Sequence, residues 1–198
     1  MYVKGVPTLM FPLTVLYETQ GPKVGSHLGS LARDYRTPAY YGLSDLIVAP
    51  CSGVIERRRP LVNGEIYLRS DGPVRVGSGR VLNDGVLITF IHCVDHLVQT
   101  GEHVRVGQPL ATFGGLYHGI RDFYSPHLHL ELSSGLASAR QTPNHYGVYC
   151  TPYQLDVSEM ALGNDVRYEY TSTPFRRRVD VERSVRIVTG KQIGRAHV

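Results

Sequence analysis

Two histidines and a glutamate alternate with leucines in residues 125–132, which read Ser-Pro-His-Leu-His-Leu-Glu-Leu. Alternation with a period of two is typical of a β-strand, because successive side chains of a strand point to opposite faces. We therefore expect His127, His129 and Glu131 to share one face, with the leucines facing a core. Two imidazoles one strand step apart can bind the same metal ion or act on the same reacting group.

A second group of candidate ligands lies far upstream, in the Gly-rich stretch 21–39, which we expect to be a long loop. His27 and Asp34 lie seven residues apart there, and Gly25 and Gly29 permit the backbone turns that bring an imidazole and a carboxylate together. Zinc binds His nitrogen and carboxylate oxygen, and a catalytic zinc site has three protein ligands plus one open position. His27, Asp34 and His129 are therefore candidate zinc ligands.

Two more histidines can stand around the open position of such a site. His127 shares a face with His129, and His92 ends the apolar run 86–91. Either imidazole can take a proton from a zinc-activated water or stabilise the oxyanion that forms at a scissile carbonyl. His92 and His127 are therefore candidates for such a role.

Each of these residues also has a purely structural interpretation. An isolated His-x-His pair is more often an ordinary surface or core feature, and Asp34 could instead cap backbone N–H groups of its loop. The zinc site is favoured because further candidates stand in order around the pair. Glu131 either orients His129 or is a solvated residue near the strand end, so we leave it outside the catalytic set.

The remaining histidines and one cysteine deserve separate interpretations. We expect ordinary surface positions for His96, His103, His118 and His145, with a substrate contact as the second interpretation for His118 alone. Cys93 directly follows His92, and adjacent strand residues face opposite sides. The thiol and the imidazole therefore cannot pair there as nucleophile and base.

Five segments of the chain, in this order, resemble the M23 family of zinc peptidases, the LytM and lysostaphin-like enzymes that cut peptidoglycan peptides. Within this family the segments most resemble the form found in phage lysins and tail-associated hydrolases. The segments are 25–34 (Gly-Ser-His-Leu-Gly-Ser-Leu-Ala-Arg-Asp), 49–55 (Ala-Pro-Cys-Ser-Gly-Val-Ile), 90–92 (Phe-Ile-His), 101–114, and 127–131 (His-Leu-His-Leu-Glu). Two features depart from the pattern: the His27-to-Asp34 spacing is longer than in many members, and the loop 117–126 is bulkier and more aromatic.

The resemblance implies both a fold and a function. The fold is all-β, an antiparallel groove or sandwich of the LytM/lysostaphin type with long loops around the zinc site. Zn²⁺ is held by His27, Asp34 and His129, while His92 and His127 are catalytic and a zinc-activated water attacks a peptide bond of bacterial peptidoglycan. The first alternative is a catalytically silent domain of this type in a phage tail or cell-wall complex. The second is a carbohydrate-binding all-β module.

The elements around these residues are predicted to be short strands. Runs at 46–49, 54–59, 65–69, 74–76 and 86–91 have β-type patterns and are separated by turns, with almost no helical periodicity. Asn-Asp-Gly at 83–85 is a hairpin signal. Residues 153–162 suit one short helix, and 167–187 alternate like strands. We place an M23-like domain at 1–153 and an appendage at 154–198.

Composition narrows the function classes. Hydrophobic residues make up 42% of the 198 residues and no long apolar run occurs, so we expect no membrane span. The N-terminus lacks the pattern of a signal peptide. A net charge of +4 is compatible with binding to an anionic polymer. We expect the partner to be peptidoglycan peptides at the cell wall rather than nucleic acid.

Three scattered cysteines without Cys-x-x-Cys indicate free thiols. The last six residues resemble a translated sequencing adapter, so we expect the natural C-terminus to be missing.

Overall fold

The computed structural model describes residues 5–13, 16–23, 25–27, 29–36, 46–139, 153–160, 166–170 and 177–181. Within these ranges the chain forms strands and 3-10 turns, with no α-helix, which confirms the expected all-β class. The strands are β1 (Leu16–Gln20), β2 (Arg33–Arg36), β3 (Leu46–Val48), β4 (Gly53–Arg59), β5 (Glu65–Ser70), β6 (Val74–Arg75), β7 (Val81–Leu82), β8 (Val86–Ile91), β9 (Cys93–Val94), β10 (His103–Val104), β11 (Pro109–Phe113), β12 (Leu128–Ser134), β13 (Gln154–Leu155), β14 (Val166–Tyr170) and β15 (Arg177–Val181).

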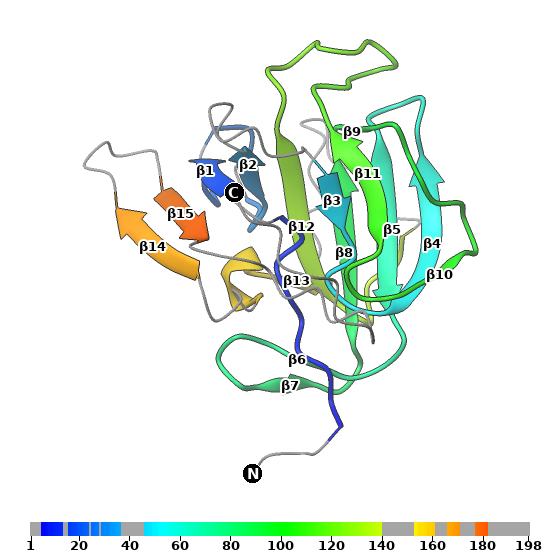
Figure 1. Ribbon diagram of the computed structural model, residues 1–198, viewed down its shortest axis with the longest axis vertical. Helices are drawn as coiled ribbons and strands as arrows, with labels where there is room; N and C mark the ends of the chain where they lie inside the picture. The colour runs from blue at the N-terminus through cyan, green and yellow to red at the C-terminus, as the bar shows by residue number, and fades with distance from the viewer. Residues whose placement is uncertain are drawn as a thin grey trace, which may run out of the picture.

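One large antiparallel sheet organises the molecule (Figure 1). Its ten strands follow the order β10-β4-β5-β8-β12-β2-β1-β15-β14, with β13 also paired to β12. A smaller sheet has the order β3-β11-β9, and β6 and β7 form a two-stranded ribbon. Strand β12 lies between β8 and β2, so the His-x-His strand occupies the middle of the large sheet.

The core lies between one face of the large sheet and the small sheet. Alternate residues of β12 and β8, among them Leu128, Leu130 and Phe90, are fully buried there against Ile47 of β3 and Leu110 of β11. These side chains obey the period of two, so the residues between them must face the other side. The predicted division of β12 into a leucine face and a histidine face is therefore confirmed.

Three local expectations are wrong. Asp34 lies in strand β2 rather than in a loop, because residues 33–36 find pairing partners in β12 and β1. Asn-Asp-Gly at 83–85 does turn the chain, with Gly85 at φ +68°, but β7 pairs with β6 and β8 pairs with β5 and β12, so no hairpin forms. The described part of 153–162 forms β13 and a 3-10 turn, Val157–Glu159, instead of a helix.

Segments after residue 153 add strands to the same large sheet. Strand β13 pairs with β12, and β15 pairs with β1 on one side and β14 on the other. The strand-like alternation predicted for this region is thus confirmed for 166–170 and 177–181. No helix in the described part of the chain has the length and hydropathy to span a membrane.

Candidate metal centre

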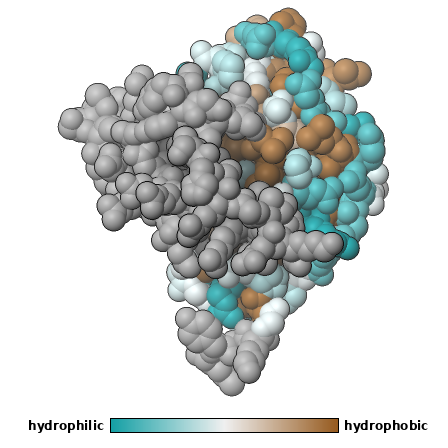
Figure 2. All heavy atoms as spheres, in the orientation of Figure 1, coloured by the Kyte–Doolittle hydropathy of each residue, from teal (hydrophilic) through white to brown (hydrophobic). Residues whose placement is uncertain are grey.

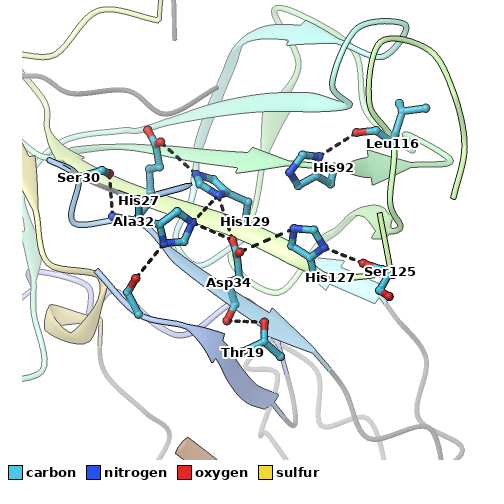
Figure 3. Close-up of polar contacts among 12 residues, drawn as sticks. Thr19, His27, Ser30, Ala32, Asp34, His92, Leu116, Ser125, His127 and His129 are labelled. Atoms are coloured by element: carbon cyan, nitrogen blue, oxygen red, sulfur yellow. Dashed lines mark hydrogen bonds and ion pairs between the residues drawn. The ribbon is translucent and has the colours of Figure 1, made fainter. Parts of the chain in front are cut away.

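The register between β2 and β12 places a carboxylate beside an imidazole. Asp34 and His129 are Cα partners in this antiparallel pair, so their side chains leave the sheet side by side on the same face. His27 comes from outside the sheet, as the last residue of the 3-10 turn Gly25–His27. Figure 3 shows the three side chains converging, with His27 and His129 reaching Asp34 from different directions. All three are buried.

Three atoms form a nearly regular triangle at this point. His27 Nε2 lies 3.2 Å from Asp34 Oδ1 and 3.1 Å from His129 Nδ1, and His129 Nδ1 lies 3.0 Å from Asp34 Oδ1. Donor atoms about 2.0–2.1 Å from a tetrahedral zinc ion are about 3.3 Å from one another. The triangle matches that spacing to within a few tenths of an ångström, and the three residues form the metal-compatible group His27, Asp34 and His129.

The outer nitrogen of each imidazole is committed to another acceptor. His27 Nδ1 lies 3.0 Å from the backbone O of Gly21, and His129 Nε2 lies 3.1 Å from Glu131 Oε1. When the rings are neutral, each of these outer nitrogens carries the proton that it donates, and the lone pairs of His27 Nε2 and His129 Nδ1 then face the Asp34 carboxylate. His27 Nε2, His129 Nδ1 and Asp34 Oδ1 lie within 3.2 Å of one another, and a cation bound between them would stabilise this arrangement.

The charges of the cluster point to the same conclusion. Burial alone would raise the pKa of Asp34, but hydrogen bonds from His129 and His27 outweigh it and hold this pKa well below its usual range. Burial also disfavours a charged His129, yet its bonds to Asp34 and Glu131 raise its pKa to about 10. The carboxylates of Asp34 and Glu131 therefore make the electrostatic potential at this point negative. Without a metal ion, the proton on His129 balances part of that charge.

His92 and His127 lie beside the triangle. The two rings are 4.6 Å apart between centroids, and the His92 ring is 6.0 Å from that of His129. His127 Nε2 lies 3.9 Å from Asp34 Oδ2. His92 Nδ1 donates to the backbone O of Leu116 over 2.8 Å, and His127 Nδ1 donates to that of Ser125 over 2.7 Å (Figure 3). Each histidine keeps its Nε2 lone pair free for a proton.

Both rings are neutral at neutral pH. Burial, together with the neighbouring His127 and His129 imidazoles, lowers the pKa of His92 to about 3. Burial also lowers the pKa of His127, against the opposing effect of Asp34. Neutral imidazoles with an unprotonated Nε2 are proton acceptors, which is the state a general base needs.

Backbone hydrogen bonds fix the two histidines to each other through Gly114. The Gly114 N–H donates to the His92 carbonyl over 2.9 Å, and the Gly114 carbonyl accepts from the His127 N–H over 3.0 Å. His92 has φ +66°, a left-handed conformation that costs a non-glycine residue free energy and that turns the chain from β8 into β9. Its N–H donates to the Asn63 carbonyl over 2.7 Å. These bonds hold the strained residue in place.

Glu131 is the site residue that sequence reasoning left out. Its side chain is buried rather than solvated, and the bond to His129 shows that it orients this imidazole. The alternation in β12 already placed Glu131 on the face of His129. Its burial could not be inferred, because the covering comes from segments far away in the sequence.

The other candidates lie away from the centre. His103 is exposed and pairs with Asp71 at 2.9 Å, and His118 is exposed on the loop between β11 and β12. His96 is half-buried, which differs from the expected surface position, and His145 lies outside the described residues. Cys93 is buried in the core, where burial raises the pKa of its thiol, so it is no nucleophile.

Comparisons with known proteins find likeness at the level of structure. No family model and no curated protein matches the sequence. A zinc-containing peptidase from Vibrio cholerae shares 20% identity over 62% of this chain and 35% of that chain, with a TM-score of 0.42. The catalytic domain of the antimicrobial peptidase lysostaphin from Staphylococcus simulans shares 18% identity over 61% of this chain and 80% of that chain, with a TM-score of 0.40.

A third solved structure is that of the catalytic domain of the prophage-encoded M23 protein EnpA from Enterococcus faecalis. It shares 16% identity over 66% of this chain and 87% of that chain, with a TM-score of 0.44. The chain thus spans about a third of the Vibrio cholerae peptidase and most of the two catalytic domains. At these identities the similarity extends to the fold alone.

Proposed function

We propose that this protein is a zinc peptidase of the M23 type that hydrolyses peptide bonds of bacterial peptidoglycan. The observation that carries the proposal is the triangle of His27 Nε2, Asp34 Oδ1 and His129 Nδ1, with sides of 3.0 to 3.2 Å. The outer nitrogens of both imidazoles are bonded to other acceptors, so the neutral rings would direct their remaining lone pairs to the point that Asp34 Oδ1 also faces. A His/His/Asp donor set with a free fourth position fits catalytic zinc.

The residues around the triangle suit acid–base chemistry. Zinc, when bound by His27, Asp34 and His129, polarises a carbonyl and lowers the pKa of a water. His92 and His127 present free Nε2 lone pairs beside this position, so each can accept a proton from the attacking water. The imidazole that has taken the proton then carries an Nε2–H, which can donate to the oxyanion or protonate the leaving amine.

The peptidoglycan substrate rests on the five sequence segments that resemble the M23 family. Three of these segments carry the residues of the proposed site: the first contains His27 and Asp34, the third ends in His92, and the last contains His127 and His129. By the same resemblance we place the activity at the bacterial cell wall, in a phage lysin or a virion-associated protein.

Zinc content and wall digestion, measured on the same preparations, test the proposal. The purified protein is expected to hold one zinc ion and to release peptide fragments from purified sacculi, identified by mass spectrometry. Asp34→Asn keeps the shape of the side chain but removes the charge, and is expected to lower both zinc occupancy and hydrolysis at least tenfold. Asp71→Asn, which changes an exposed carboxylate paired with His103, is the matched control and should leave both unchanged.

The outcomes separate the alternatives. Full hydrolysis by Asp34→Asn, or undiminished hydrolysis after complete removal of zinc with a chelator, contradicts the proposal. Stoichiometric zinc without hydrolysis of any sacculus identifies a catalytically silent domain. Binding of glycan without stoichiometric zinc identifies a carbohydrate-binding module.

A further inference from the structure

Arg36 lies on the same face of the large sheet as the candidate metal ligands. It is the last residue of β2, two positions after Asp34, and residues two apart in a strand share a face. Tyr35 between them points the other way, into the hydrophobic core. Tyr35 is the Cα partner of Leu128 in β12, so continuing this antiparallel register by one step brings Arg36 opposite His127.

The positive charge of Arg36 acts on the ring of His127. Burial is the largest effect on the pKa of His127 and lowers it, and the charge of Arg36 acts in the same direction. A like charge disfavours the protonated imidazole only when it is close, because the repulsion weakens with distance. The two side chains are therefore neighbours in space as well as in strand register.

Within the ranges that the structure describes, the guanidinium of Arg36 is not paired with a carboxylate. Its Nε is buried without a hydrogen-bond partner, although the side chain as a whole is partly exposed. By contrast, Arg33 on the same strand forms ion pairs of 2.7 Å with Glu18 and 3.0 Å with Asp156. A buried donor that lacks a partner costs free energy, so the fold gains no stability from the placement of Arg36. Such unfavourable placements are typical of functional sites.

Asp34, the carboxylate nearest in the strand, faces the histidines instead. Its Oδ1 lies 3.2 Å from His27 Nε2 and 3.0 Å from His129 Nδ1, and its Oδ2 lies 3.9 Å from His127 Nε2. Arg36 therefore keeps a positive charge for a ligand beside the candidate metal centre. A carboxylate, at a side chain or a chain end, is the anionic group that a peptide contains, and a guanidinium can bind it with two parallel N–H···O bonds.

We propose that Arg36 is a specificity-determining residue, which binds a free carboxylate on the peptide residue next to the scissile bond. A peptide bond that reacts at the candidate metal position, with His127 as a proton acceptor, brings its neighbouring residue within reach of Arg36. The proposal rests on the proposed function and narrows its substrate: wall peptides with a free carboxylate here are cut in preference to peptides in which it is an amide or is absent, as in oligoglycine. A hydrogen-bonded charge of this kind typically changes kcat/KM by about 10–100-fold.

Soluble muropeptides, released from sacculi by a muramidase, test the proposal with the zinc-loaded chain. They are N-acetylated and then used in two forms, with free carboxylates or with these converted to amides by a carbodiimide and ammonia. We expect kcat/KM of the wild type to be about 10–100-fold higher for the free carboxylates. In Arg36→Gln this preference should fall to a few-fold through a higher KM, with zinc content unchanged, whereas Arg36→Lys, which keeps the charge, should retain part of it.

Arg105→Gln is the matched control. It removes an exposed charge from the turn after β10, at an edge of the molecule where hydrophilic residues predominate (Figures 1 and 2). This edge strand is separated from β12 in the large sheet by β4, β5 and β8. Arg105→Gln should therefore keep the wild-type preference.

Calorimetric Kd values for the two forms at low temperature separate carboxylate binding from hydrolysis. The proposal requires tighter binding of the free carboxylates by the wild type, and a smaller difference in Arg36→Gln, whether or not any muropeptide is cut. Equal Kd and equal kcat/KM for the two forms overturn it, as does a preference that Arg36→Gln leaves unchanged. A loss confined to kcat and equal for both forms also overturns it and assigns Arg36 to the reacting carbonyl. Selective binding that depends on Arg36, without hydrolysis of any muropeptide or sacculus, leaves the carboxylate site standing and rejects the peptidase.

Discussion

His129 and Glu131 face each other along β12, with Nε2 of the imidazole 3.1 Å from Oε1 of the carboxylate. Residues two apart in a strand lie on the same face, so the strand itself sets this contact. The carboxylate fixes the proton on the outer nitrogen and leaves Nδ1 as the candidate ligand. Such partners of ligating histidines typically affect metal affinity by 10–100-fold.

Glu131→Gln therefore tests the orientation of His129. Glutamine keeps the size of the side chain and an oxygen acceptor, so only the charge is lost, and we expect zinc affinity to fall about tenfold. Competition with a chromophoric chelator measures this change. Glu56→Gln, which alters a carboxylate of β4 that is paired with Arg69 of β5, is the control. Equal zinc affinity in wild type and Glu131→Gln would show that the contact does not tune the metal.

The left-handed backbone at His92 predicts an unusual order of stabilities. Alanine and glycine both remove the imidazole, but at φ +66° only glycine avoids the clash between Cβ and the following carbonyl. His92→Gly should be more stable than His92→Ala by about 1 kcal/mol in urea unfolding, although glycine normally destabilises folded chains. The reverse order would mean that the backbone relaxes once the imidazole is gone.

Gly115 is predicted to be irreplaceable for a different reason. A Cβ at this position would lie 1.8 Å from the backbone O of Tyr124, so Gly115→Ala must push the two segments of the loop apart. We expect a loss of about 1–3 kcal/mol in unfolding free energy, and reduced peptide hydrolysis because Tyr124 and His127 shift together. At Gly72 a Cβ meets nothing within 4 Å, so Gly72→Ala serves as the control. Equal stability of the two variants contradicts the expected clash.

The hydrogen bonds of Asp156 with Arg33 and Ser158 predict that the stability of the fold depends on pH. Asp156 accepts from the Arg33 Nε–H over 3.1 Å and from the Ser158 N–H over 2.8 Å. Burial alone would raise the pKa of Asp156, but the hydrogen bonds from Ser158 and Arg33 together have the larger effect. The pKa of Asp156 therefore lies below its usual range. Because the folded-state pKa is the lower one, the stabilisation is present above the unfolded-state pKa of about 3.9 and is lost as pH falls through the folded value.

Asp156→Asn measures this contribution. Its side chain is 34% exposed, so solvent screens the charge and we expect a loss of about 0.5–1 kcal/mol at pH 7 that shrinks towards zero near pH 3. Urea unfolding at both pH values gives the difference. Asp84→Asn, in the exposed turn after β7, is the control. A difference that stays constant with pH would show that the charge is not responsible.

Local sequence patterns were enough to predict the strands in which apolar and polar residues alternate or in which apolar residues form a continuous run. Leu128 and Leu130 defined the buried face of β12, and with it the shared face of His127 and His129. The apolar run before His92 likewise predicted β8. In these segments the order of apolar and polar residues itself indicates which side chains are buried. The strand can therefore be predicted without knowing which strand it pairs with.

Long-range pairing accounts for what the sequence could not supply. Asp34 lies in a strand because its partner His129 is 95 residues further along, and residues 83–85 make no hairpin because β8 prefers β5 and β12 over β7. Glu131 is buried for a similar reason. Gly-rich and turn-like signals describe the local backbone, whereas these outcomes depend on which distant strand offers a pairing edge.

Gly114 has a consequence for how this protein can diversify. Its hydrogen bonds to His92 and His127 close the base of the β11–β12 loop, so the residues from 115 to 126 form an insert with fixed ends. Chimaeras that exchange this insert for one of another length or composition are then expected to keep the candidate metal ligands and both histidines in register. A single scaffold can in this way be adapted to substrates of different chemistry by exchanging one segment.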